Sequence, residues 1–269
     1  MDRNVKNFNT RLRTIKIREL VLASFIALML ALGLSFIFPI LDTNDDAFMI
    51  CVLTFLVIFF AWCLKGSSGL NEDIQSVFLK ENRKEILYVF IINLTFAYLF
   101  LFSVVVLDFI IAMGDPTWIS ALDIDSVSLA PDAFLLSAIT SIIYAPVLEE
   151  LIFRGVLFNR LKIRTGIIPA MIVSSFLFAI GHDFGGIVSA FLFGVCMCIL
   201  YLKTDNILIP MSVHVINNIV ATLIDLTPFD SIITSFPWII LLGIAIAIAT
   251  VLLIKYIITE TRSLNRKYS

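Results

Sequence analysis

Long apolar stretches alternate with short polar connections along almost the whole chain. A run of about 20 apolar residues is what an α-helix needs to cross the hydrocarbon core of a membrane. The pattern therefore predicts an all-α, polytopic membrane protein, a bundle of about eight transmembrane helices. The predicted spans are 20–40, 46–64, 85–112, 132–158, 166–182, 186–202, 207–224 and 236–258.

The eight spans form one integral membrane domain with three parts. Residues 1–131 contain the N-terminal tail and three helices, 132–224 contain four helices with unusual polar residues, and 225–269 contain the last helix and a tail. The first span follows a basic stretch, as a signal peptide would. Its apolar run is too long and no small-residue cleavage site follows, so we expect a retained anchor.

The polar segment 65–84 interrupts the apolar pattern between the second and third spans. It is compatible with a surface helix that turns Ile74, Val77 and Phe78 toward the lipid headgroups. A solvated loop is an equally good interpretation.

Composition excludes a water-soluble protein. Of the 269 residues, 60% are hydrophobic and the mean hydropathy is +1.02, whereas soluble domains average roughly 45–50% apolar residues. The net charge is -2 and no basic cluster suggests a nucleic-acid partner. The lipid bilayer is the predicted surrounding.

Charge also predicts the orientation. With eight spans both chain ends share one side, and all 19 Lys and Arg residues fall on that side or in the half-spans nearest to it. The positive-inside rule then makes both termini cytoplasmic in a multi-pass protein of the cell membrane. The opposite loops contain no Lys or Arg but hold Asp42, Asp45, Asp46, Asp115, Asp123, Asp125, Asp183, Asp225 and Asp230.

The four cysteines, Cys51, Cys63, Cys196 and Cys198, all lie within apolar runs and are interpreted as small hydrophobic residues. Cys196 and Cys198 would diverge by roughly 200° on a helix, so they cannot clamp one metal ion. We expect no disulfide framework.

The fourth span carries ionisable residues where a membrane protein tolerates them least. Glu150 and Arg154 are four residues apart, share a helical face and partly neutralise each other. Glu149 points roughly 100° away, lacks that partner and is a candidate general base. Pro146 should leave the carbonyl of Ile142 unpaired and bend the helix. Alternatively, both acids only balance Arg154 or face a water-filled vestibule, which explains Glu150 better than Glu149.

The chain's only two histidines lie in two later spans. Phe178 and His182 are four residues apart, so the phenyl ring can pack beside the imidazole. His214 and Asn218 have the same spacing and could both donate hydrogen bonds into a cavity. Alternatively, His182 is an interfacial residue at a helix end, and His214 and Asn218 join helices by hydrogen bonds.

Together these residues resemble the CPBP intramembrane proteases, the group that contains the type II CAAX prenyl endopeptidases and the bacterial Abi proteins. The family motifs EExxxR, FxxxH and HxxxN occur in order and without departure within residues 132–224. The resemblance implies an eight-helix bundle with a site that opens toward the cytoplasm. It also implies a role for each motif residue: Glu149 and His182 activate water, His214 and Asn218 stabilise the oxyanion, and Glu150 and Arg154 hold the architecture.

The role of metal is open from the sequence. Glu149, His182 and His214 could form a three-ligand zinc site with an open water position. The chain has no HExxH helix and no spare histidine. We favour a metal-free mechanism that requires no cofactor.

Depth in the membrane is a difficulty for the proposed pair of Glu149 and His182. Counting residues from the cytoplasmic ends of their spans places His182 about 10 Å higher than Glu149, at about 1.5 Å per residue. A tilted span, or one that starts deeper, would close the gap.

The favoured hypothesis is an intramembrane endopeptidase that hydrolyses a peptide bond in a membrane-associated or lipidated peptide or protein. One alternative is a non-catalytic binding or bacteriocin-immunity protein on the same scaffold. Another is a transporter with Glu149 as a proton-relay carboxylate, although no inverted repeat is visible.

Overall fold

The computed structural model describes residues 1–111 and 131–268, and within these residues the chain is helical and contains no strand. Asp115, Asp123 and Asp125 lie outside the described residues. The all-α prediction is confirmed. The helices are α1 (Phe8–Leu12), α2 (Ile17–Ser35), α3 (Ile40–Thr43), α4 (Asp45–Leu64), α5 (Leu70–Val77), α6 (Lys80–Ala97), α7 (Leu99–Ile111), α8 (Pro131–Ile139), η2 (Thr140–Tyr144), α9 (Ala145–Glu149), η3 (Glu150–Phe158), α10 (Asn159–Thr165), α11 (Ile167–Ala179), η4 (Phe184–Gly186), α12 (Ile187–Thr204), α13 (Leu208–Asp225), α14 (Phe229–Thr234) and α15 (Trp238–Tyr268).

Within the described residues, seven helical segments are long and apolar enough to cross a membrane, which confirms a polytopic architecture. The predicted fifth span, 166–182, is shorter than expected. It forms α11, whose 13 residues reach only about 20 Å at 1.5 Å per residue, against a hydrocarbon core of about 30 Å. The helix ends at Ala179 because the Gly181–Gly186 segment turns the chain back into α12.

Three other segments also differ from, or refine, the predicted elements. The third span is two helices, α6 and α7, which meet at Tyr98. The basic connection after the fourth span, predicted as a loop, is the helix α10. The segment 65–84, for which helix and loop were equally good interpretations, contains the helix α5.

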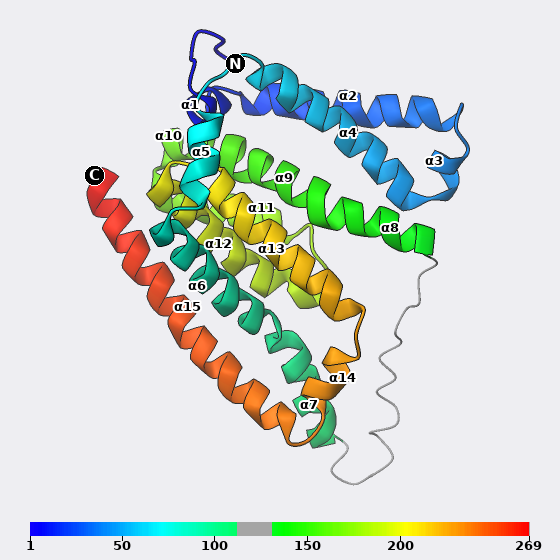
Figure 1. Cartoon of the computed structure of the whole chain (residues 1–269), viewed down its shortest axis with the longest axis vertical. Helices are drawn as coiled ribbons and strands as arrows, with labels where there is room; N and C mark the ends of the chain where they lie inside the picture. Colours follow the sequence, from blue (N-terminus) through cyan, green and yellow to red (C-terminus); the bar gives the residue numbers. More distant parts are fainter. Residues whose placement is uncertain (112–130, 269) are drawn as a thin grey trace.

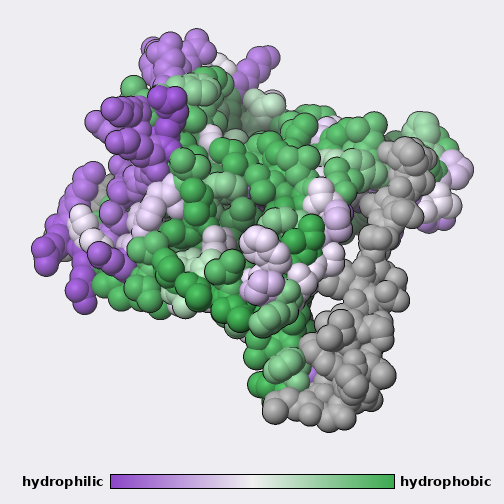
Figure 2. Space-filling view, turned by 60° about the horizontal axis from the view of Figure 1, so that its bottom comes forward, coloured by the Kyte–Doolittle hydropathy of each residue, from purple (hydrophilic) through white to green (hydrophobic). Residues whose placement is uncertain are grey.

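Both chain ends lie at the same end of the bundle, together with α1, α5 and α10 (Figure 1). Hydrophilic residues gather at this end, and a broad hydrophobic surface covers the rest of the face seen in Figure 2. The arrangement agrees with an even number of crossings. The cytoplasmic assignment of this end remains a prediction from the charge pattern.

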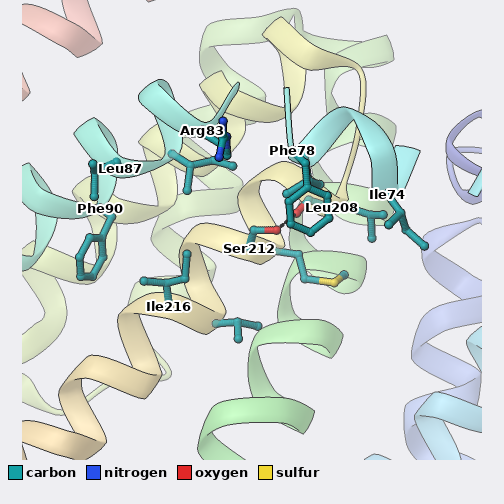
Figure 3. Close-up of a pocket in the computed structure, with 12 residues that line it drawn as sticks. Ile74, Phe78, Arg83, Leu87, Phe90, Leu208, Ser212 and Ile216 are labelled. Carbon is teal, nitrogen blue, oxygen red and sulfur yellow. Dashed lines mark hydrogen bonds between the residues drawn. The ribbon is translucent and has the colours of Figure 1, made fainter. Parts of the chain in front are cut away.

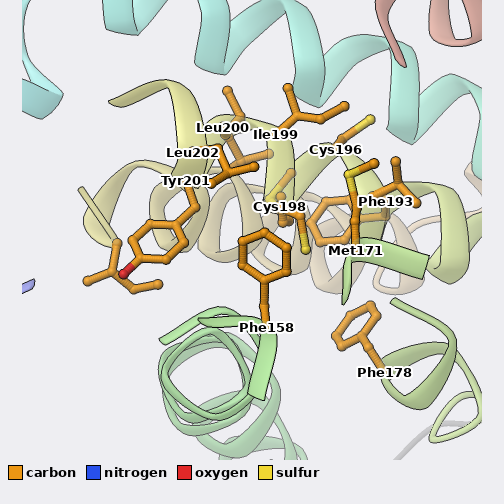
Figure 4. Packing of buried hydrophobic residues seen from close by; sticks show 14 of the residues in the cluster. Phe158, Met171, Phe178, Phe193, Cys196, Cys198, Ile199, Leu200, Tyr201 and Leu202 are labelled. Carbon is orange, nitrogen blue, oxygen red and sulfur yellow. The ribbon is translucent and has the colours of Figure 1, made fainter. Parts of the chain in front are cut away.

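The hairpin of α2 and α4 forms one edge of the bundle and α15 forms the opposite edge (Figure 1). Between them α12 is the central helix, where every residue from Phe193 to Leu202 is buried. Aromatic, aliphatic and sulfur side chains from α12, α11 and η3 interlock around it, among them Phe158, Met171, Phe178, Cys196 and Cys198 (Figure 4).

All four cysteines are free, as expected for small hydrophobic residues.

The fourth span is not a regular α-helix. Its α9 segment lies between two π-helical stretches, η2 and η3. Ala145 N–H donates to the carbonyl of Thr140, five residues earlier. π-helical turns inside α-helices occur frequently at functional sites, and this one places the two glutamates at the junction of α9 and η3.

An N-terminal hook, residues 1–16, binds the end of the bundle where both chain termini lie. The Asn9 side chain donates to Asp73 Oδ2 (2.7 Å) and accepts from the N–H of Ile207 (3.0 Å), so it joins α5 to the start of α13. Leu12 is fully buried and packs so closely on Gly155 that a Cβ there would lie 2.7 Å from it. The hook therefore contacts the helix that carries the two glutamates.

Candidate active site

Glu150 is the centre of a fully buried ion cluster. Its Oε1 accepts a hydrogen bond from Arg154 Nη1 (2.9 Å), and both side chains are 0% exposed. The same oxygen lies 3.0 Å from Nδ1 of His214, which donates to it from α13. Two donors from two helices thus converge on one carboxylate oxygen. The predicted pairing of Glu150 with Arg154 is present, and its link to His214 was not foreseen.

Glu149 lies beside this cluster at the last residue of α9. Its Oε2 is 3.6 Å from Nε2 of His214, and its side chain is 31% exposed whereas that of Glu150 is 0% exposed. The two adjacent acids therefore differ: one is sealed inside the protein and the other borders accessible space.

Hydrogen bonds set the tautomers of both histidines. His214 uses Nδ1 toward Glu150, and His182 donates through Nδ1 to the carbonyl of Phe178 (3.1 Å). In a neutral imidazole whose Nδ1 is protonated, Nε2 carries the free lone pair. Both rings thus keep Nε2 for other partners, and that of His214 faces Glu149.

Phe178 connects the histidines to the arginine. Its ring centroid lies 4.7 Å from that of His182 and 5.7 Å from that of His214. The guanidinium carbon of Arg154 lies 4.5 Å from the same ring. The predicted packing of Phe178 on His182 is confirmed, and the ring also separates the sealed cluster from the more exposed His182.

The expected depth mismatch does not keep these groups apart. His182 follows the end of the short α11 rather than lying within a full-length span. Its exposed imidazole packs on the ring of Phe178, which also contacts His214, at centroid distances of 4.7 Å and 5.7 Å. The residues from α9, η3, α11 and α13 therefore form one site.

Asn218 takes an unexpected partner. Its Nδ2 donates to the carbonyl of Ser141 (2.7 Å), the residue five positions before Pro146. In the i to i−5 pattern of a π-helix, the residue at 146 would donate to this carbonyl, and proline has no N–H. The sequence predicted that Pro146 would free the carbonyl of Ile142. Because this stretch is π-helical, the carbonyl that lacks a backbone donor is that of Ser141, and the Asn218 side chain donates to it.

Sequence reasoning missed two members of the site. The ring of Phe193 on α12 lies 5.0 Å from that of His214 and packs edge-on against it. Phe153 packs edge-on against Phe178 at 5.5 Å. Both occur in uniformly apolar segments, so nothing in the local pattern distinguishes them from other core residues.

The predicted metal ligands, Glu149, His182 and His214, are chemically suitable, and Glu150 on Nδ1 of His214 resembles the outer partner of a metal-bound histidine. Within residues 1–111 and 131–268, however, no group of three or more His, Cys, Asp or Glu side chains has the geometry to hold an ion.

Two comparisons with known proteins agree with these motifs. Residues 131–220 match the family model described as "Type II CAAX prenyl endopeptidase Rce1-like". A protein of Bacillus subtilis (strain 168) named "Putative membrane peptidase YdiL" is 33% identical over 94 residues, which are 35% of this chain and 38% of that protein. No solved structure matches the chain significantly.

The matched segment includes all three motifs and ends shortly after Asn218. The similarity to the Bacillus protein covers well under half of either chain. The predicted resemblance to the CPBP group is confirmed, and residues 131–220 of this membrane protein are similar to the Rce1-like family.

Proposed function

We propose that the protein is an intramembrane endopeptidase that hydrolyses a peptide bond in a membrane-associated or lipidated peptide or protein. The observation that supports the proposal is that Glu149 lies 3.6 Å from His214, and that the ring of Phe178 joins His214 to His182 at one site. A hydrolase needs a base, an acid and donors for the developing oxyanion. These residues supply all three kinds of group.

In the proposed reaction, a water molecule binds between Glu149 and Nε2 of His182. The Glu149 carboxylate takes a proton from the water as its oxygen attacks the carbonyl carbon of the scissile bond. The carbonyl π electrons move to its oxygen, which becomes the oxyanion. When the C–N bond breaks, the proton held by Glu149 passes to the leaving nitrogen and leaves the free amine and the new carboxyl group.

His214 and Asn218 are the proposed oxyanion donors. As an oxyanion donor His214 carries a proton on Nε2 in addition to that on Nδ1, and the carboxylates of Glu149 and Glu150 lie 3.6 Å and 3.0 Å from these two nitrogens. The amide of Asn218 has two N–H groups, of which the bond to Ser141 uses one. The second supports the proposed role.

The decisive experiment compares purified Glu149→Gln and His182→Asn with the unmodified protein in lipid nanodiscs, on a library of membrane-anchored peptides. Loss of the base should reduce turnover about 10²–10⁴-fold, and Asn218→Ala should reduce it about 10²–10³-fold. The matched control is Asp183→Asn, which changes the exposed neighbour of His182 and should leave turnover within twofold, roughly the scatter of such comparisons.

Three results decide between the hypotheses. Turnover that survives Glu149→Gln would contradict the proposed base. A complete lack of cleavage by the folded, unmodified protein, together with unchanged partner binding in both variants, would support the binding or immunity alternative. The metal-free mechanism predicts that chelation leaves activity unchanged. Activity that disappears on chelation and returns with Zn²⁺ would contradict it and support a zinc mechanism.

A further inference from the structure

A groove of about 610 Å³ lies on the outer side of α13, between α5, α6 and α13. Side chains from the three helices point into it, among them Phe78, Leu87, Phe90, Leu208 and Ile216 (Figure 3). All lining residues except Arg83 and Ser212 are apolar. This is a hydrophobic slot with one cationic side chain.

The groove and the candidate active site use neighbouring faces of α13. Ser212 and Ile216 line the groove, and each lies two residues from His214. At 100° per residue they point roughly 160° away from the imidazole, whereas Val215 and Met211, which also line the groove, point only roughly 100° and 60° away. The groove therefore runs beside the candidate site, and its lining includes none of the residues Glu149, His182, His214 and Asn218.

The dimensions of the groove fit one leaflet of a bilayer. From Arg83 to Phe90 along α6, and from Leu208 to Ile216 along α13, the lining extends about 10–12 Å at 1.5 Å per residue. One leaflet contributes about half of the roughly 30 Å hydrocarbon core. Both helices begin at the hydrophilic end of the bundle (Figure 1), so Arg83 lies at the headgroup end and Phe90 lies deeper.

Arg83 is the one charged residue among the described residues that line the groove, and it favours an anionic ligand. Its side chain is exposed, and within the described part of the chain it makes no hydrogen bond or ion pair. No carboxylate lines the groove, and the hydroxyl of Ser212 is already bonded to the carbonyl of Leu208 (2.7 Å). The N-terminal end of α6 also carries the positive end of the helix dipole, which favours anions.

We propose that this groove binds an anionic phospholipid, with an acyl chain between α5, α6 and α13 and the phosphate on Arg83. The occupant is a lipid of the same leaflet rather than the peptide substrate. Guanidinium groups bind phosphate through paired donors, and each basic side chain near an anionic surface contributes measurable attraction. Because the bound acyl chain packs against α13, it also stabilises the helix that presents His214 and Asn218.

The test measures lipid retention by native mass spectrometry after purification with equal amounts of phosphatidylglycerol and phosphatidylcholine. The unmodified protein should retain phosphatidylglycerol preferentially. Arg83→Ala should weaken that retention about fivefold. Lys84→Ala removes an exposed cation on the same helix that does not line the groove, and it should leave retention unchanged.

A second pair of variants tests the acyl-chain position without altering charge. Leu87→Trp fills the groove and should abolish preferential retention. Ile91→Trp adds the same bulk one turn later at an exposed position outside the groove, and retention should persist. All four variants change exposed residues of α6, so folding should be preserved.

The outcomes separate this proposal from the proposed peptidase function, because retention can be measured in Glu149→Gln protein. Equal retention of both lipids, or unchanged retention in Arg83→Ala and Leu87→Trp, would overturn the lipid site whatever the catalytic result. If Leu87→Trp instead abolishes binding of a lipidated peptide and leaves phosphatidylglycerol retention intact, the occupant is the substrate and the proposal is wrong.

Discussion

The central helix and the outer hairpin are almost equally apolar, yet they have different surroundings. The spans at Ile17–Ser35, Asp45–Leu64 and Phe184–Thr204 have mean hydropathies of 2.0, 2.7 and 2.2. In the central span 61% of the most apolar stretch is buried inside the protein, whereas in each of the two outer spans only 17% of that stretch is buried. Hydropathy thus identifies membrane helices but does not distinguish those that face lipid from those that face protein.

The polar groups follow this division. Glu150, Arg154 and His214 are buried on helices that pack around α12, and so are Ser174 and Ser175 of α11. Ser174 donates to the carbonyl of Phe153 (2.9 Å) and thereby fixes α11 against η3. In the hairpin, the hydroxyl of Thr54 lies 2.7 Å from the carbonyl of Ile50 in its own helix and 3.5 Å from the hydroxyl of Tyr144 in η2. A charge can remain in the membrane where neighbouring helices supply its partners, because lipid supplies none.

The largest expected effect comes from breaking the buried ion cluster. Arg154→Ala leaves the carboxylate of Glu150 sealed in the protein without its cation and should destabilise the fold by about 3–5 kcal/mol. Arg18→Ala, at an exposed position in the first turn of α2, should cost less than about 0.5 kcal/mol. The measurement is unfolding in mixed micelles, followed by the reactivity of the buried thiols Cys196 and Cys198.

An additional variant sharpens the first prediction. Arg154→Met combined with Glu150→Leu removes both charges and should recover part of the lost stability, because the isolated buried charge is gone. If Arg154→Ala and Arg18→Ala had equal effects, the inner cluster would not be a structural element.

A cavity in the centre should cost more than the same deletion at the edge. Leu200 on α12 is 0% exposed, whereas Leu32 on α2 is 42% exposed to the surroundings. Leu200→Ala should destabilise the protein by about 2–4 kcal/mol, because packed neighbours cannot fill the void. Leu32→Ala should cost under about 1 kcal/mol, since lipid tails can replace the lost contacts. Similar unfolding midpoints for the two variants would argue against the central position of α12.

The smallest effect should come from two glycines. A Cβ at Gly194 would lie 2.9 Å from Cβ and 3.1 Å from Cα of Ser175, whereas nothing lies within 4 Å at Gly33. Gly194→Ala should therefore force α11 and α12 apart and cost about 1–3 kcal/mol. Gly33→Ala should be neutral or stabilising by up to about 1 kcal/mol. Opposite shifts in thermal midpoint would support the comparison, and a neutral Gly194→Ala would contradict the close contact.

Much of the site could be predicted because its residues recur at helical spacing. Glu150 and Arg154, and likewise Phe178 and His182, contact each other four positions apart as expected. The bond from His214 to Glu150 and that from Asn218 to Ser141 span 64 and 77 residues. No local pattern predicts such pairs, because they depend on how α13 packs against the π-helical segment.

The sequence alone determined the helical membrane architecture, the approximate spans and the identity of the polar groups, because each follows from local hydropathy and residue type. The tertiary structure decided which glutamate is sealed, which nitrogen of each histidine remains free and which apolar helix lies in the centre. These features arise from packing between helices, and helices of equal hydropathy can be arranged in many ways. Close fit and the pairing of buried polar groups select one arrangement.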